Sequence, residues 1–121
     1  MTPRDMDLIR ELLLRFEQND TSLPEGRTMK DVGYHVKQMI DAGLIEGQVI
    51  EAPSPGKLAP KDFFVRDITP KGHDFLDAIR NDTFWAKLKN EFQKKAVAVT
   101  VELVILCAKE LSKSMLGLNH P

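Results

Sequence analysis

Four polar side chains between residues 28 and 42 have the types and spacing needed to bind a nucleic acid. Lys30, Tyr34, Lys37 and Gln38 recur at three- and four-residue intervals, so a helix would place them on one face. Lysine and glutamine contact phosphates and base edges in a DNA major groove. This pattern predicts a DNA-binding face. An ordinary solvated helix face is the alternative interpretation, because acidic residues lie nearby.

Three further basic side chains lie in the segment that follows this helix. Lys57 and Lys61 fall in a proline-rich stretch, and Arg66 lies on the strand expected after it. At the tip of a β-hairpin these side chains could contact the DNA backbone or a minor groove, and binding would then weaken steeply as salt is added. A loop that lysines keep soluble is the alternative interpretation.

The residue types used in catalysis and metal binding do not form a recognisable set. The sequence has no Ser-His-Asp order, glycine-rich phosphate loop or paired cysteines. We expect His35 to be partly buried and hydrogen-bonded to the backbone, and His73 to pair on the surface with Asp77. We therefore predict a protein that is not an enzyme and uses no metal, cofactor or small-molecule substrate.

Length and composition agree with one small intracellular domain. The chain has 121 residues and a net charge of −1, without the basic excess that many nucleic-acid-binding proteins carry. Cys107 is the only cysteine, which excludes an internal disulfide and predicts a cytoplasmic location. The longest apolar stretch, residues 96–108, is shorter than the about 20 residues that span a bilayer, so no membrane association is expected.

Local sequence signals predict the first two helices and their ends. Thr2 and Pro3 are expected to cap and begin the first helix, and the turn-forming residues 19–27 end it. Thr28 is expected to cap a second helix that stops at Gly43. No helix is expected between these two, so the positioning helix of a complete helix-turn-helix motif is missing.

A β-hairpin and a third helix are expected next. Residues 44–50 and 63–68 have the pattern of its two strands, and the prolines between residues 52 and 62 predict an irregular tip. A threonine and a proline at positions 69 and 70 then begin a helix whose apolar residues form two opposite faces. Either this helix breaks at residues 81–83, or its second face contacts the last helix or another subunit.

Residues 96–116 are apolar enough to require burial. Alternating valines fit a strand, whereas steps of three and four fit a helical seam, and the length of the run favours the helix. The preceding domain has little room to cover such a helix, so pairing of two subunits is the simplest prediction. The predicted homodimer seam consists of Val97, Val101, Val104, Ala108, Leu111 and Met115.

Three segments together carry a family resemblance. They are residues 4–10 (RDMDLIR), residues 34–47 (YHVKQMIDAGLIEG) and residues 68–85 (ITPKGHDFLDAIRNDTFW). In these segments the chain resembles the bacterial and phage domain-of-unknown-function family 2513. The resemblance covers most of residues 1–95, and it implies a small winged-helix fold of a kind often encoded in phages and mobile elements.

The sequence thus predicts a mainly α, α+β protein. We expect a winged-helix-like domain over residues 1–95, built as helix, helix, two-stranded wing and helix, and a dimerising C-terminal helix over residues 96–121. The predicted function is binding of double-stranded DNA, with a role in transcriptional regulation. The alternative is a protein–protein interaction module in which the winged helix is only a scaffold, since fold does not fix function.

Overall fold

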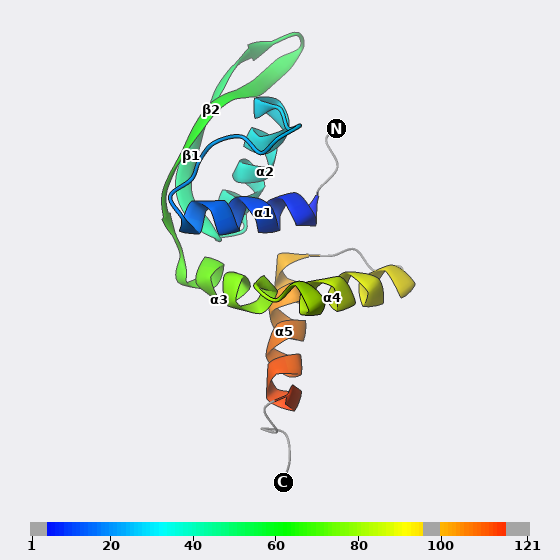
Figure 1. Cartoon of the computed structure of the whole chain (residues 1–121). Helices are drawn as coiled ribbons and strands as arrows, with labels where there is room; N and C mark the ends of the chain where they lie inside the picture. The colour runs from blue at the N-terminus through cyan, green and yellow to red at the C-terminus, as the bar shows by residue number, and fades with distance from the viewer. Residues whose placement is uncertain (1–4, 96–99, 116–121) are drawn as a thin grey trace. The chain divides into compact units, whose positions relative to one another are not determined.

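Among the residues that the structure describes, five helices and one antiparallel hairpin make up the fold (Figure 1). The computed structural model describes residues 5–95 and 100–115. The mainly helical α+β class and the predicted order of elements are confirmed, in an arrangement compatible with a winged helix. In chain order the elements are α1 (Met6–Glu17), α2 (Met29–Asp41), β1 (Ile45–Ser54), β2 (Lys57–Ile68), α3 (Pro70–Ile79), α4 (Asp82–Lys94) and α5 (Val101–Met115).

The chain divides into two compact units, residues 1–73 and residues 74–121. The first unit contains α1, α2 and the hairpin, and the second contains α4 and α5. The division falls within α3, whereas the sequence predicted a boundary after residue 95. No helix of the described residues is long and apolar enough to cross a membrane.

Helix α1 begins later than the sequence predicted. Its N-cap is Asp5, whose carboxylate accepts a hydrogen bond from the backbone N–H of Leu8 at 3.1 Å. Aspartate is a strong N-cap and satisfies a donor that the helix itself leaves unpaired. The predicted start at Pro3 is therefore wrong, and Thr2 and Pro3 lie outside the described residues. The buried face of α1 consists of Met6, Leu8, Ile9, Leu12, Leu13 and Phe16.

Both ends of α2 follow the predicted local signals. The Thr28 side chain accepts a hydrogen bond from the backbone N–H of Asp31 at 3.1 Å. At the other end Gly43 has a φ of 78°, in the left-handed region that favours glycine, and the N–H of Leu44 donates to the carbonyl of Met39 at 2.9 Å. These contacts end the helix and turn the chain directly into β1.

The hairpin is longer and more regular than predicted. It pairs without interruption by a loop from Ile45 opposite Ile68 to Ser54 opposite Lys57, with register shifts at two places. The prediction that residues 52–62 are irregular is therefore wrong. Each strand of a two-stranded sheet has one unpaired edge, where proline costs no ladder hydrogen bond. The prolines in this stretch are thus compatible with strand, and Gly56, with a φ of 76°, makes the tight turn.

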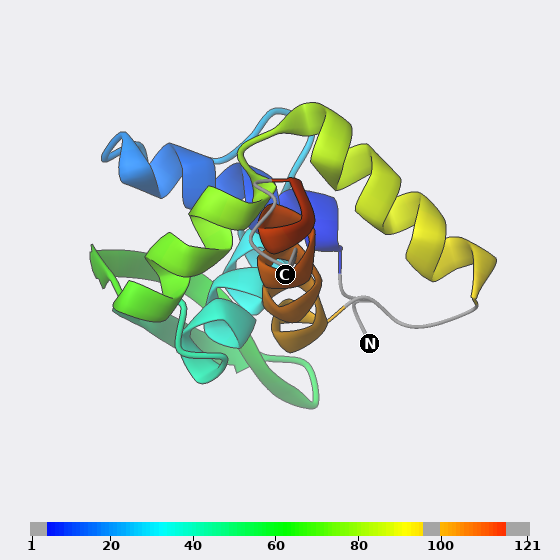
Figure 2. The same cartoon turned by 90° about the horizontal axis from the view of Figure 1, so that it is seen from below.

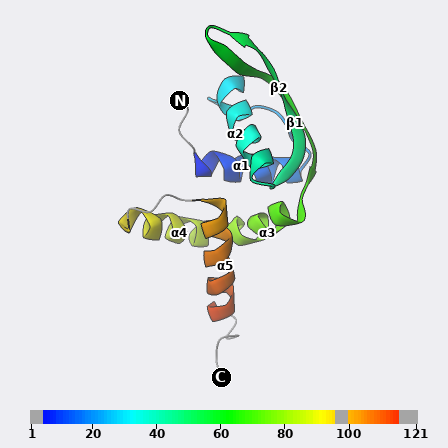
Figure 3. The same ribbon diagram turned by 180° about the vertical axis from the view of Figure 1, so that it is seen from behind.

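One face of the hairpin packs against the two helices of its unit (Figures 1 and 3). Phe63 on β2 is buried, and its ring centroid lies 6.0 Å from that of Phe16 on α1. The hairpin approaches α2 closely at Gly33, where an added Cβ would lie 2.3 Å from the Cβ of Pro60. A glycine inside a helix costs about 1 kcal/mol relative to alanine. Here it lets β2 lie directly on α2.

His35 connects α2 to the start of α1. Its side chain is 0% exposed. Its Nδ1 lies 2.8 Å from the carbonyl of Asp31, and its Nε2 accepts a hydrogen bond from the backbone N–H of Asp5 at 2.9 Å. A neutral imidazole with its proton on Nδ1 satisfies both contacts. The predicted burial and backbone hydrogen bonding of His35 are confirmed, and its burial is complete.

An ionic clasp holds the segment between α1 and α2. Arg27 donates to Asp5 at 2.7 Å and to Asp31 at 3.0 Å, so one guanidinium joins the N-cap of α1 to the first turn of α2. Partial burial of the Asp5 carboxyl opposes ionisation. The hydrogen bond from Arg27, those from the Leu8 and Asp7 backbones, and the charge of Arg27 together outweigh it and lower the pKa of Asp5.

Because of this clasp, we expect the protein to lose stability at low pH. Because the folded-state pKa of Asp5 is below its ordinary value of 3.8, its contribution is complete above pH 3.8 and disappears as the pH falls through the lower folded-state pKa. Asp5→Asn keeps a capping oxygen but removes the charge. We expect it to cost less than about 1 kcal/mol near pH 7 and to flatten the acid limb of the stability curve. Urea unfolding between pH 2 and pH 7 measures both effects, and an unchanged acid limb would contradict this account.

The helices after the hairpin are separated by clear caps. The Thr69 hydroxyl accepts a hydrogen bond from the N–H of Gly72 at 3.0 Å at the start of α3, as predicted. Asn81 caps α4 by accepting from the N–H of Phe84 at 2.9 Å, so of the two alternatives left open by the sequence the structure shows the break between the two apolar faces. In the second unit α5 is a helix rather than a strand and runs across α4 (Figures 1 and 2). Buried residues of these two helices include Trp85, Leu88, Phe92, Val101 and Val104.

Candidate nucleic-acid interface

A groove runs between the polar face of α2 and the outer half of the hairpin. Its volume is about 620 Å³. Helix α2 supplies one wall because its buried side faces the body of the unit, and the bend of the hairpin over Gly33 supplies the other. We call it the α2–hairpin groove. It is lined by Lys30, Tyr34, Lys37, Gln38, Asp41, Glu51, Lys57, Leu58, Ala59 and Pro60.

Most of the predicted nucleic-acid-binding residues meet in this groove. They are Lys30, Tyr34, Lys37, Gln38 and Lys57. The other two predicted residues, Lys61 and Arg66, do not line it. Arg66 is 73% exposed and pairs with Glu46 at 2.8 Å. Arg66 thus forms an ion pair across the two strands. Lys61 lies beside the register shift near Glu51, outside the groove lining.

The groove is weakly positive within an acidic unit. Three lysines line it against two carboxylates, and Lys37 is paired with Glu51 at 3.5 Å. Lys30 and Lys57 make no ion pair with any residue that the structure describes. Residues 5–73 as a whole carry nine lysines and arginines against twelve aspartates and glutamates. Positive charge is therefore concentrated on this surface relative to the rest of the unit.

The hairpin wall also contributes apolar surface that sequence reasoning missed. Leu58 is 61% exposed at the hairpin tip, next to Ala59 and Pro60. Across the groove the ring of Tyr34 is half-buried and packs edge-on against His35, with centroids 5.7 Å apart. A prediction of strand for residues 52–62 would have indicated that Leu58, Ala59 and Pro60 belong to the hairpin.

Gln38 is an exception to the usual pairing of buried polar atoms. Its Oε1 is buried and has no hydrogen-bond partner in the described part of the chain. Such groups are few in folded proteins, because an unpaired buried amide oxygen loses its hydrogen bonds to water without replacement. The side chain nevertheless forms part of the groove wall. The groove wall thus includes a residue with an unused hydrogen-bonding group.

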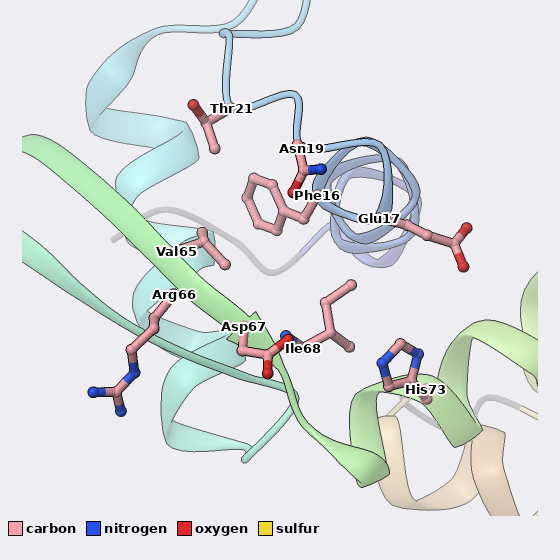
Figure 4. A pocket seen from close by; sticks show the side chains of 9 residues that line it. All are labelled: Phe16, Glu17, Asn19, Thr21, Val65, Arg66, Asp67, Ile68 and His73. Carbon is pink, nitrogen blue, oxygen red and sulfur yellow. The ribbon is translucent and has the colours of Figure 1, made fainter.

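A second, smaller pocket of about 260 Å³ lies between the end of α1, the end of β2 and the first turn of α3 (Figure 4). His73 lines it and is exposed, but the charged side chains do not converge. Arg66 extends away from the pocket, and Glu17 points outward on the opposite side (Figure 4). Among the residues described, no group of three or more histidine, cysteine, aspartate or glutamate side chains could hold a metal ion. The predicted pairing of His73 with Asp77 stays a prediction.

The predicted homodimer seam falls partly within the described residues. Val101 and Val104 are already buried within a single chain, and Val97 lies outside the described part. Leu106, a neighbour that the prediction did not include, is 57% exposed on α5. Ala108, Leu111 and Met115 belong to the same helix. Pairing of two subunits through α5 stays a prediction.

Comparison with known proteins places the chain in a family. The family model described as "Hypothetical protein (DUF2513)" matches residues 3–98. A protein of Haemophilus influenzae described as "Uncharacterized protein" is 35% identical over 121 aligned residues, which cover 94% of this chain and 98% of that protein. No solved structure matches. Since the family model spans most of the chain and the relative is aligned almost end to end, the chain belongs to the DUF2513 family.

Proposed function

We propose that the protein binds double-stranded DNA with the α2–hairpin groove, and that it acts by occupying DNA sites as a regulator. Helix α2 would present its polar face to the major groove, and the hairpin tip would reach the neighbouring backbone. The observation that carries the proposal is the convergence of Lys30, Lys37, Gln38 and Lys57 on one surface from two separate elements.

Binding through this surface would be weak and sensitive to salt. Two unpaired lysines and one lysine shared with Glu51 can neutralise about two or three phosphates. The acidic remainder of residues 5–73 would repel DNA from other faces and so favour a single orientation. No helix precedes α2 between residues 18 and 28 to cross the backbone, which removes further contacts.

Titration of a labelled random duplex tests the proposal. With about two or three phosphates neutralised, affinity should fall roughly 10-fold or more between 50 mM and 200 mM salt. Fluorescence anisotropy of the full-length protein measures both values. Absence of binding at 50 mM salt, or binding that salt does not weaken, would refute the proposed function.

Charge reversal locates the contact. We expect Lys30→Glu and Lys57→Glu each to weaken duplex binding about 10-fold, because each removes one phosphate contact and adds repulsion. Lys61→Glu is the matched control, with the same change of charge on the same strand but outside the groove. Its effect should be clearly smaller. Equal losses for all three variants would indicate a general charge effect and not this groove.

An extended peptide is a second candidate ligand for the groove. The observation in its favour is the mixed lining, in which Asp41 and Glu51 stand among the lysines and exposed Leu58 adds apolar surface. A peptide with basic and apolar side chains would match it. Failure of duplex binding at low salt would favour this class of partner over DNA.

A further inference from the structure

Gln38 lines the groove that the proposed function assigns to DNA, and its amide oxygen is buried without a hydrogen-bond partner among the described residues. Helix α2 sets this position, because Gln38 lies between its buried face at Met39 and its exposed face at Lys37. A buried amide oxygen with no hydrogen bond destabilises the free protein. Each such group in a folded protein calls for an explanation, and a functional role is one of them.

Glutamine chemistry suggests which ligand group would do so. In the DNA major groove a glutamine amide can accept from N6 of adenine and donate to N7, a pair that distinguishes adenine from the other bases. The groove neighbours of Gln38 are Lys30, Lys37 and Lys57, which suit phosphates and carry no base information. Gln38 is thus the groove residue best suited to read sequence.

We infer that Gln38 is the specificity-determining residue of the α2–hairpin groove, and that its amide turns out of the unpaired position to read an adenine. The inference rests on the proposed function. A purely structural role would not account for the missing partner, because an apolar side chain of the same length would fill the space without an unpaired oxygen. Gln38→Met is that replacement.

Two measurements on Gln38→Met test the inference. Without DNA, its melting temperature should rise by about 2–6 °C, because the unpaired oxygen is removed. In selection from a random duplex library, the wild-type protein should enrich adenine at one position. The variant should lose roughly 10-fold of that preference. Gln48→Met is the control, since Gln48 is exposed on the hairpin and outside the groove.

The outcomes separate this inference from the proposed function. If the wild-type protein binds duplex but Gln38→Met keeps the same base preference, or the wild-type protein enriches no base, the inference is wrong and DNA binding stands. A lower melting temperature for Gln38→Met would also overturn it, because the amide would then be stabilising. If the wild-type protein binds no duplex at 50 mM salt, both fail.

Discussion

Replacing His35 by alanine should lower the free energy of unfolding by about 2–4 kcal/mol. The side chain is fully buried, so truncation leaves a cavity. It also removes the acceptor for the backbone N–H of Asp5, which then has no protein partner for a hydrogen bond now 2.9 Å long. Both losses fall where α1 begins and where the Arg27 clasp joins the two helices.

Urea denaturation at pH 7 measures this effect, with His73→Ala as the matched control. His73 is exposed and lies on a helix, so its replacement should change the free energy of unfolding by no more than about 0.5 kcal/mol. His35→Gln keeps a polar side chain and should recover part of the loss. If His35→Ala lowered the free energy of unfolding as little as His73→Ala, His35 would not connect α1 and α2 as described.

Helix ends could be predicted where they depend on neighbouring residues. Thr28, Gly43 and Asn81 act through contacts with residues three to five positions away, and sequence shows those partners directly. The first cap was missed because Thr2 followed by Pro3 competed with Asp5. The contact of His35 with Asp5, 30 positions apart, needs the two helices packed together and cannot be read locally.

The length of the hairpin was underestimated because of its prolines. Proline excludes a central strand but not an exposed edge, and sequence does not say how many strands a sheet will have. With two strands, Pro53 and Pro60 fit into a ladder that reaches Ser54 opposite Lys57. The length of the hairpin is therefore a tertiary property of this fold.

The candidate site could likewise be predicted only where it depends on local sequence. Periodicity in α2 correctly grouped Lys30, Tyr34, Lys37 and Gln38, because a helix face is a local property. The register shift between Ile50 and Glu51 places Glu51 at the groove beside Lys37, and no local signal shows this pairing. Sequence thus found the basic residues of the groove but not the ion pair between Lys37 and Glu51.

Adding one methyl group at Gly33 should lower the free energy of unfolding by up to about 2 kcal/mol, although alanine is the better helix former. The new Cβ would lie 2.3 Å from Cβ and 3.0 Å from Cγ of Pro60, and a proline ring cannot turn aside. Overpacking of this kind costs typically 1–3 kcal/mol, more than the about 1 kcal/mol gained in helix propensity. Gly33→Ala must therefore push β2 away from α2 and widen the groove.

A double-mutant cycle separates this clash from other effects of the substitution. Pro60→Gly removes the ring that the new methyl group would meet, so Gly33→Ala made in that background should cost little or should stabilise. Urea denaturation of the four proteins gives the coupling between the two sites, which we expect to exceed about 1 kcal/mol. Because Gly33→Ala would push the hairpin wall away from α2, it should also weaken duplex binding, and Pro60→Gly in the same protein should restore part of that binding. Additive effects of the two substitutions would mean that the hairpin does not rest on α2 at this point, and the groove on which the proposed function depends would then not exist in solution.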